Sequence, residues 1–212
     1  MRLFASIRRS PLGRLFLVLP VLALVGACAA GPQQAETRDI GLDLWTGDPG
    51  IAGVTLPQVQ AVHGTRTISG PTAWTHDKTG LALQVYERRN AETEGVKVQY
   101  FVRRADGQAL GRVFDSRPGR ADRHFVNDAF FPLGTWARGE SRDFQLIEYS
   151  EAGPQNFIAT IKIRRLDFTF RDVPHSLRYD WILRDANGNV IYNERYVYSP
   201  GVGFASFDNR LK

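Results

Sequence analysis

The sequence predicts an all-β protein built as a single antiparallel sandwich. From residue 80 onward, apolar and polar residues alternate one by one, as they do in half-buried strands. One Asp-Gly pair and one Asn-Gly pair each separate two of these runs, and both pairs favour tight hairpin turns. No stretch of the chain carries a sustained apolar stripe at helical spacing. Together, these three observations favour strands joined by short turns.

The first clear strand is expected over 96–103. Its even positions are apolar (Val96, Val98, Tyr100 and Val102), whereas Lys97, Gln99 and Arg103 lie on the opposite face. Asp106-Gly107 then predicts a hairpin turn, because glycine adopts a positive φ at little steric cost. The chain continues from this turn into a second apolar run that contains Leu110, Val113 and Phe114.

The C-terminal half predicts four further strand-like runs, at 157–163, 166–170, 177–183 and 190–198. The apolar positions change from odd to even at Arg164-Arg165, so one extra residue must be accommodated there by a bulge or a sharp bend. Asn187-Gly188 predicts the turn between the last two runs.

Residues 39–212 are expected to form this one domain, with roughly seven to nine strands in an immunoglobulin-like or similar sandwich. Residues 39–79 are less regular and are expected as an extension or as edge strands. Gly134-Thr135-Trp136 resembles the G-x-W motif of lipocalins, in which it opens the first strand of a closed barrel. Only 76 residues (212 − 136) follow Trp136, too few for eight strands and their turns, so the sandwich is preferred.

Residues 1–27 predict a signal peptide. Arg2, Arg8, Arg9 and Arg14 precede an apolar run over 15–27. At 1.5 Å per residue this run spans about 20 Å, which is short of the hydrocarbon core of a bilayer at about 30 Å. The pattern is therefore typical of a signal peptide rather than of a membrane span.

The end of the apolar run, Leu24-Val25-Gly26-Ala27-Cys28, resembles the lipobox of bacterial lipoprotein precursors, although most of that family have leucine in the place of Val25. The resemblance covers residues 1–28 only. It implies cleavage after Ala27, acylation of Cys28 and a membrane-anchored tether over 28–38. Because Ala29 stands where an aspartate would resemble an inner-membrane retention signal, the resemblance also implies the periplasmic face of the outer membrane.

The charge balance argues against a nucleic-acid partner. The chain has 27 Lys and Arg residues against 22 Asp and Glu, but four of the arginines lie in the predicted signal peptide. The remaining balance of 23 (27 − 4) against 22 offers no basic excess for phosphate backbones. A single cysteine also excludes an internal disulfide and a cysteine-based zinc site, and no cofactor is expected.

One candidate ligand site is the group of Trp136, Arg138, Glu140 and Arg142. A ring face beside guanidinium donors could bind a ligand, or the tryptophan could close one end of the sandwich.

Two further groups carry weaker signals. The first is Asp122, His124 and Asp128. These side chains are of the types that bind zinc or manganese, although they could also be ordinary hydrogen-bonding groups on the surface. The second is Tyr192, Tyr196 and Tyr198, which lie on one face of a predicted strand. That face is a surface for a protein partner if it is exposed, and part of the core if it is buried.

No motif of nucleophilic or metal-dependent catalysis is present, so a non-catalytic protein is favoured. Three functions remain open, in order of preference. The first is a lipid-anchored accessory subunit that binds another envelope protein. The second is a periplasmic module that binds a glycan or a small ligand at Trp136 and its neighbouring arginines. The third is an envelope hydrolase whose catalytic residues converge only in the folded chain.

Overall fold

The computed structural model describes residues 36–47 and 66–211. The predicted signal peptide, Ala27, Cys28 and most of the predicted tether lie outside these residues. Within the described ranges every strand pairing is antiparallel and the single helix has five residues, which confirms the predicted all-β class. No helix in these ranges is long and apolar enough to cross a membrane.

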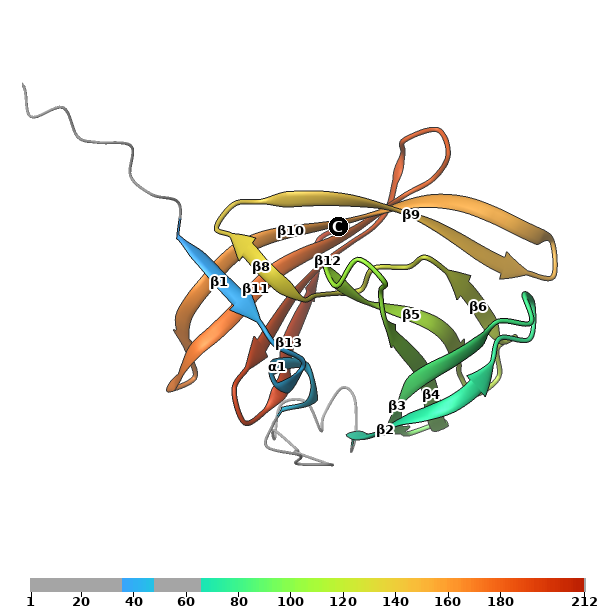
Figure 1. The fold of residues 1–212 in the computed structure, drawn as a ribbon, viewed down its shortest axis with the longest axis horizontal. Helices are drawn as coiled ribbons and strands as arrows, with labels where there is room; N and C mark the ends of the chain where they lie inside the picture. The colour runs from blue at the N-terminus through green and yellow to red at the C-terminus, as the bar shows by residue number, and fades with distance from the viewer. Residues whose placement is uncertain (1–35, 48–65, 212) are drawn as a thin grey trace, which may run out of the picture. The chain divides into compact units, whose positions relative to one another are not determined.

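Most strands belong to one sheet of 11 strands (Figure 1). The path runs β13-β12-β11-β10-β9-β6-β5-β4-β3-β2, and β7 pairs with β5 beside it. These strands are β2 (Arg66–Thr75), β3 (Ala82–Glu92), β4 (Gly95–Arg103), β5 (Ala109–Ser116), β6 (Arg123–Val126), β7 (Phe131–Pro132), β9 (Ser141–Ser150), β10 (Gly153–Phe170), β11 (Val173–Arg184), β12 (Val190–Ser199) and β13 (Gly203–Asn209). A second sheet pairs β1 (Thr37–Ile40) with β8 (Gly134–Ala137), and α1 (Leu42–Thr46) follows β1.

The long sheet bends so that its two halves, β2 to β6 and β9 to β13, face each other across a common core (Figure 1). Phe130, between β6 and β7, packs against both halves. Its ring centroid lies 5.6 Å from that of Phe101 on β4 and 5.3 Å from that of Tyr196 on β12. The Arg112 guanidinium on β5 lies 5.8 Å from the ring centroid of Trp181 on β11. The antiparallel strands are therefore layered as in a sandwich.

The predicted N-terminal extension supplies part of this core. Trp45 of α1 is buried, and its ring centroid lies 5.0 Å from that of Phe101. Gly47 ends the helix with a φ of 82°, and a Cβ atom there would meet the main-chain carbon of Val202 at 2.6 Å. Only glycine fits this close approach without strain. β2 lies at one edge of the long sheet, which is one of the two predicted arrangements.

The predicted turns and bulge are confirmed. Gly107 lies in the β4–β5 turn with a φ of 68°, and Gly188 lies in the β11–β12 turn with a φ of 85°. β10 runs through Arg164, but its register against β11 shifts between Ile163 and Arg165. The bulge absorbs the extra residue that the change of apolar parity requires.

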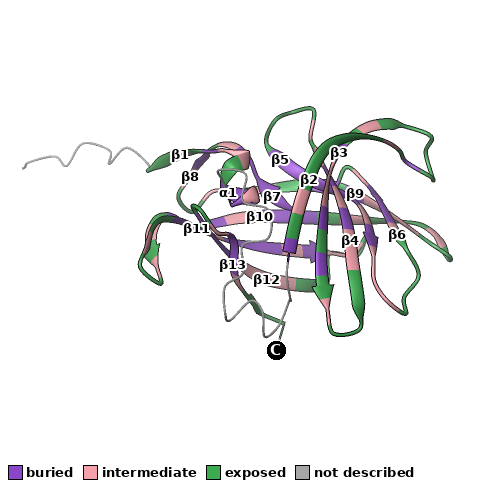
Figure 2. Cartoon of the chain, turned by 90° about the horizontal axis from the view of Figure 1, so that it is seen from below, coloured by how far each residue is buried: buried purple, intermediate pink, exposed green. Residues whose placement is uncertain are grey.

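The interior face of β4 is not its apolar face. Buried and exposed residues alternate along the strands (Figure 2), but on β4 Val96 is 49% exposed whereas Gln99 and Phe101 are fully buried. Gln99 is paired with Arg88 of β3 on one side and with Asp115 of β5 on the other. A buried amide is tolerated because it is hydrogen-bonded. Part of the interior is therefore polar.

Candidate anion-binding cavity

A cavity of about 180 Å³ lies where this polar interior of β2 to β5 faces aromatic residues of the opposite half of the sheet. We call it the basic cavity. It is lined by Arg66, Arg88, Asn90, Lys97, Gln99, Arg112, Arg117, Phe130, Trp181, Glu194, Tyr196, Phe204 and Phe207.

Strand register aims the polar side chains into the basic cavity. Arg66, Asn90 and Lys97 are opposite one another on β2, β3 and β4, and form one row across the strands. Arg88 and Gln99 belong to the next row, two residues along. Residues two apart on a strand point to the same side, so both rows share the interior face.

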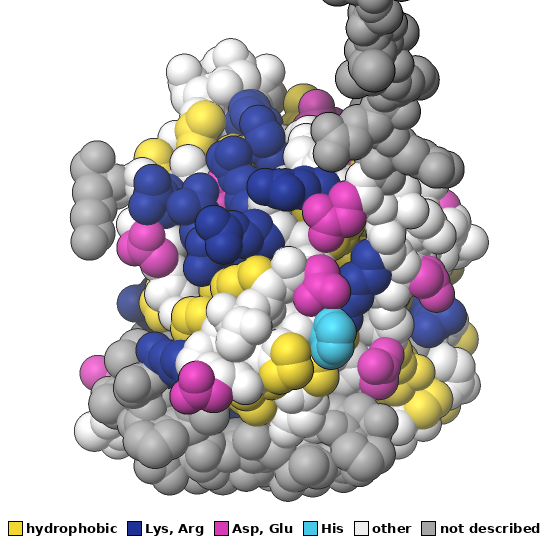
Figure 3. All heavy atoms as spheres, turned by 90° about the vertical axis from the view of Figure 1, so that its left-hand side faces the viewer, with side chains coloured by type: hydrophobic (Ala, Val, Ile, Leu, Met, Phe, Trp, Pro, Cys, Tyr) yellow, Lys and Arg dark blue, Asp and Glu magenta, His cyan; other side chains and the backbone are white. Residues whose placement is uncertain are grey.

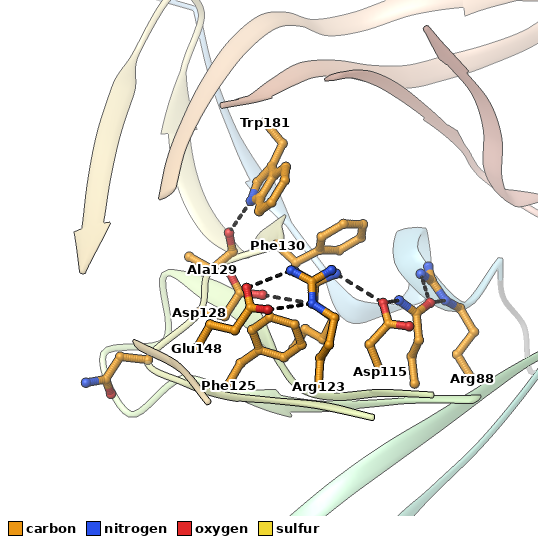
Figure 4. Close-up of polar contacts among 12 residues, drawn as sticks. Arg88, Asp115, Arg123, Phe125, Asp128, Ala129, Phe130, Glu148 and Trp181 are labelled. Atoms are coloured by element: carbon orange, nitrogen blue, oxygen red, sulfur yellow. Dashed lines mark hydrogen bonds and ion pairs between the residues drawn. The ribbon is translucent and has the colours of Figure 1, made fainter. Parts of the chain in front are cut away.

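A chain of hydrogen bonds crosses the second row (Figure 4). Arg88 Nε donates to Gln99 Oε1 at 3.1 Å, and Gln99 Nε2 donates to Asp115 Oδ2 at 2.8 Å. Asp115 also accepts hydrogen bonds from Arg117 Nε at 3.0 Å and from Arg112 Nη1 at 3.3 Å. The carboxylate of Asp115 is thus engaged by an amide and two guanidinium groups.

The cavity carries more positive than negative charge. Its five cations are Arg66, Arg88, Lys97, Arg112 and Arg117. The carboxylates next to them are Asp115, Glu194 and Asp128, whose Oδ2 lies 3.4 Å from Arg112 Nε. Five basic groups against three carboxylates leave a surplus of two positive charges when Lys97 is protonated, and of one when it is neutral.

Three of these cations have no carboxylate partner among the described residues: Arg66, Arg88 and Lys97. Arg66 donates instead to the main-chain oxygens of Val202 and Phe204, each at 3.3 Å. Buried charges in proteins are normally paired, so the surplus cations are well placed to receive an anion.

Burial and mutual repulsion shift the pKa values of these groups. Burial, with a further contribution from the charge of Arg88, lowers the pKa of Arg66 to about 10. Burial also lowers the pKa of Lys97, to about 7. The charges of Arg88, Arg117 and Arg112 lower it further and oppose the effect of Asp115, which raises it. Burial alone would raise the pKa of Asp115, but its arginine partners and Lys97 outweigh that effect and hold it well below its usual range.

Aromatic rings form the other wall of the cavity. The guanidinium of Arg66 lies 5.2 Å from the ring centroid of Phe204, and that of Arg88 lies 5.5 Å from the ring centroid of Phe130. Asn90 is 8% exposed, and its Oδ1 atom has no hydrogen-bond donor among the described residues. The cavity therefore combines cations, an unpaired amide oxygen and flat apolar walls.

A larger hollow of about 670 Å³ lies under the β2–β3 hairpin, and we call it the outer cleft. Its lining is mainly apolar, with Leu83, Val102 and Val113 among the side chains. Its charged groups include Arg104, whose Nη2 lies 3.0 Å from Asp106 Oδ2, and the Arg112–Asp128 pair. Arg103 also lines the outer cleft and makes no ion pair with the described residues. The basic cavity has three such cations, so it is the stronger candidate for recognising an anion.

The ligand site predicted at Trp136 is a closed cluster. Trp136 is fully buried and donates from its indole nitrogen to the Leu133 carbonyl at 2.9 Å. The Arg142 guanidinium lies 3.9 Å from the centroid of its ring, and Arg142 Nε donates to Glu140 Oε1 at 2.7 Å. Arg138 is exposed and lies 3.7 Å from Glu36. No face of the indole is open to a ligand.

The structure separates the members of the other two predicted groups. Tyr196 and Tyr198 are buried, so most of this face is core, whereas Tyr192 is 42% exposed. The predicted metal site is wrong: within 36–47 and 66–211, no group of three or more His, Cys, Asp or Glu side chains could hold a metal ion. Asp128 is paired with Arg112, His124 packs against His76, and Asp122 is exposed. The three side chains therefore do not converge on one point.

No family model, no curated protein and no solved structure matches the chain. The residues of the basic cavity were not predicted, since they are dispersed over seven strands and two loops. A signal was present in β3, where the run Glu87, Arg88, Arg89 and Asn90 puts polar residues on both faces of the strand. A strand inside a sheet that is polar on both faces indicates a polar interior.

Proposed function

We propose that the chain is a non-catalytic binding protein that holds a small organic anion in the basic cavity. The observation that carries this proposal is the surplus of positive charge inside the protein, on Arg66, Arg88 and Lys97. Arginine supplies paired N–H donors in the geometry of a carboxylate or phosphate.

The size of the cavity limits the ligand. A protein cavity of about 150 Å³ accommodates benzene, so about 180 Å³ suits a single ring or a short chain with one acidic group. The walls at Phe130 and Trp181 favour a flat apolar body, while Arg88 lies on the side where the acid would bind.

The proposed place of action is the bacterial envelope, with Cys28 acylated and inserted in the outer membrane. Its support is the resemblance of residues 24–28 to a lipobox. Replacing Cys28 by serine tests this proposal, because a hydroxyl does not receive the thioether-linked lipid. We expect radiolabelled palmitate incorporation to disappear and the protein to leave the membrane fraction. Labelling of the serine variant at the wild-type level would contradict lipid attachment at Cys28.

A second proposed function is that of an accessory subunit that binds an acidic envelope protein. Lys and Arg side chains gather on the side of the protein where β10 turns into β11 (Figure 3). There Arg165 lies opposite Arg178 in the strand register, and both guanidinium groups contact the ring of Phe168, at 5.7 and 4.7 Å. Like charges opposite each other destabilise a sheet, and a partner carboxylate would relieve them.

The two proposed functions are separable by experiment. Arg178→Glu should lower the recovery of a crosslinked envelope protein without changing binding of benzoate, whereas Arg120→Glu, in an exposed turn, serves as the control. Titration of the detergent-solubilised full chain with benzoate tests the first proposal. We expect saturable one-to-one binding by calorimetry; no heat of binding at millimolar benzoate would contradict it.

A further inference from the structure

Lys97 stands apart from the other cations of the basic cavity. It projects from β4 in the row shared with Arg66 and Asn90, and it lines the cavity while remaining half-buried. It makes no ion pair and no hydrogen bond with any of the described side chains. The nearest carboxylate, Asp115, is already bound by Arg112 and Arg117.

The surroundings of this amine favour its neutral form. Arg88, Arg112 and Arg117 repel a charge on it, and burial removes part of its hydration. The resulting pKa of about 7 leaves a large fraction of free amine at neutral pH. A lysine that is desolvated and close to other cations is an activated nucleophile toward carbonyl groups.

The same cavity can hold a carbonyl compound next to this amine. The guanidinium groups of Arg66 and Arg88 offer sites for a carboxylate, and the rings of Phe130 and Trp181 limit the space available to water. We propose that the ligand is a small oxo acid, a molecule with both a carboxylate and a ketone or aldehyde, and that Lys97 captures it as a reversible imine. This inference rests on the anion-binding function proposed above.

The proposed capture is a simple condensation. The lone pair of Lys97 Nζ attacks the carbonyl carbon, and the C=O π electrons move to oxygen. Proton transfer from nitrogen to oxygen gives a carbinolamine. Loss of its hydroxyl with the second amine proton, as one water molecule, forms the C=N bond. The reverse reaction takes up one water and releases the unchanged oxo acid, so no oxidant or reductant is needed.

Reductive trapping tests the proposal. The full chain is incubated with pyruvate at neutral pH and reduced with sodium cyanoborohydride, and modified peptides are then located by mass spectrometry. We expect the N-alkylated product at Lys97 and at least about tenfold less at Lys78 and Lys162, which line neither described cavity. Benzoate should suppress modification of Lys97, since it competes for the same cations.

Two variants make the result specific. Lys97→Arg keeps the positive charge but removes the nucleophile, so it should abolish trapping while its melting temperature reports that the chain is folded. Arg88→Met should reduce trapping at Lys97 at least about tenfold, because the carboxylate is no longer held, whereas Arg89→Met on the outer face should not.

Two negative results have different meanings. If benzoate binds but pyruvate modifies Lys97 no more than Lys78, the imine proposal is overturned while the anion-binding function stands. If neither benzoate binding nor trapping is detected, both proposals are overturned. Trapping that persists in Lys97→Arg would also overturn the assignment to Lys97.

Discussion

Arg88 is connected to Asp115 through Gln99, which lies between them in the same row of the basic cavity, so the two opposite charges do not neutralise each other directly. Arg88 Nε donates to the Gln99 side-chain oxygen at 3.1 Å, and the Gln99 amide nitrogen donates to Asp115 at 2.8 Å. The ion pairs of Asp115 go instead to Arg112 and Arg117. Arg88 is thereby held in place by a neutral group and keeps its charge for a ligand.

Lys97→Met is predicted to stabilise the chain in a pH-dependent way. The pKa of Lys97 is about 7 in the folded chain and about 10.5 in the unfolded chain, so between these values the unfolded state binds more protons. The contribution of Lys97 to the free energy of unfolding therefore rises as the pH increases from 7 to 10.5. Below pH 7 the lysine is charged in both states and its destabilising effect is complete.

Urea denaturation at pH 6.5 and pH 9 measures this effect. Lys97→Met should exceed the wild type in stability at pH 6.5, and the difference should shrink at pH 9. The charged groups around Lys97 are Asp115, Arg88, Arg112 and Arg117, so Lys78→Met, outside this cluster, is the control. Equal differences at the two pH values would contradict the shifted pKa.

Arg112→Met is predicted to destabilise the fold by about 3–5 kcal/mol, because it leaves a buried carboxylate without its counter-charge. Asp128 is 1% exposed, and Arg112 is its only ion-pair partner in the described ranges. Arg89→Met, which removes an exposed pair with Glu87, should change stability by at most about 1 kcal/mol. The free energies of unfolding of both variants are compared by urea denaturation. Equal losses in the two variants would show that the Arg112–Asp128 contact has no structural role.

Local signals in the sequence were enough for two hairpin turns and one bulge but not for the cavity. Asp106-Gly107 and Asn187-Gly188 predict their turns because glycine permits a positive φ, and the parity change at Arg164-Arg165 predicts the bulge. The basic cavity depends on which rows of different strands meet, and no local pattern encodes that. Arg66 and Phe204, 138 residues apart, meet only because the sheet bends back on itself.

Trp136 shows the reverse case. A local pattern predicts a ligand site there, but in the folded chain the surrounding side chains pack over the ring. An aromatic residue followed by Arg138 and Arg142 has the composition of a ligand platform, but Trp136 is fully buried and Arg142 covers its ring. Composition does not reveal whether the ring face is exposed.

Arg142→Met should therefore leave ligand binding unchanged. Losing the contact between its guanidinium and the Trp136 ring should cost about 0.5–2 kcal/mol of stability. Calorimetry with benzoate and thermal melting measure the two effects separately. A tenfold loss of benzoate affinity in a folded Arg142→Met chain would place the ligand at Trp136 instead of the basic cavity.

The most direct measurement compares benzoate binding to Arg88→Met and Arg89→Met by calorimetry. These variants make the same change at adjacent positions of β3, but Arg88 lines the basic cavity whereas Arg89 lies on the outer face beside Glu87. Hydrogen bonds to a charged group contribute about 1.5–3 kcal/mol, so Arg88→Met should weaken binding about 10- to 150-fold. Arg89→Met should bind as the wild type does. Equal affinity in the two variants would contradict anion binding in the basic cavity.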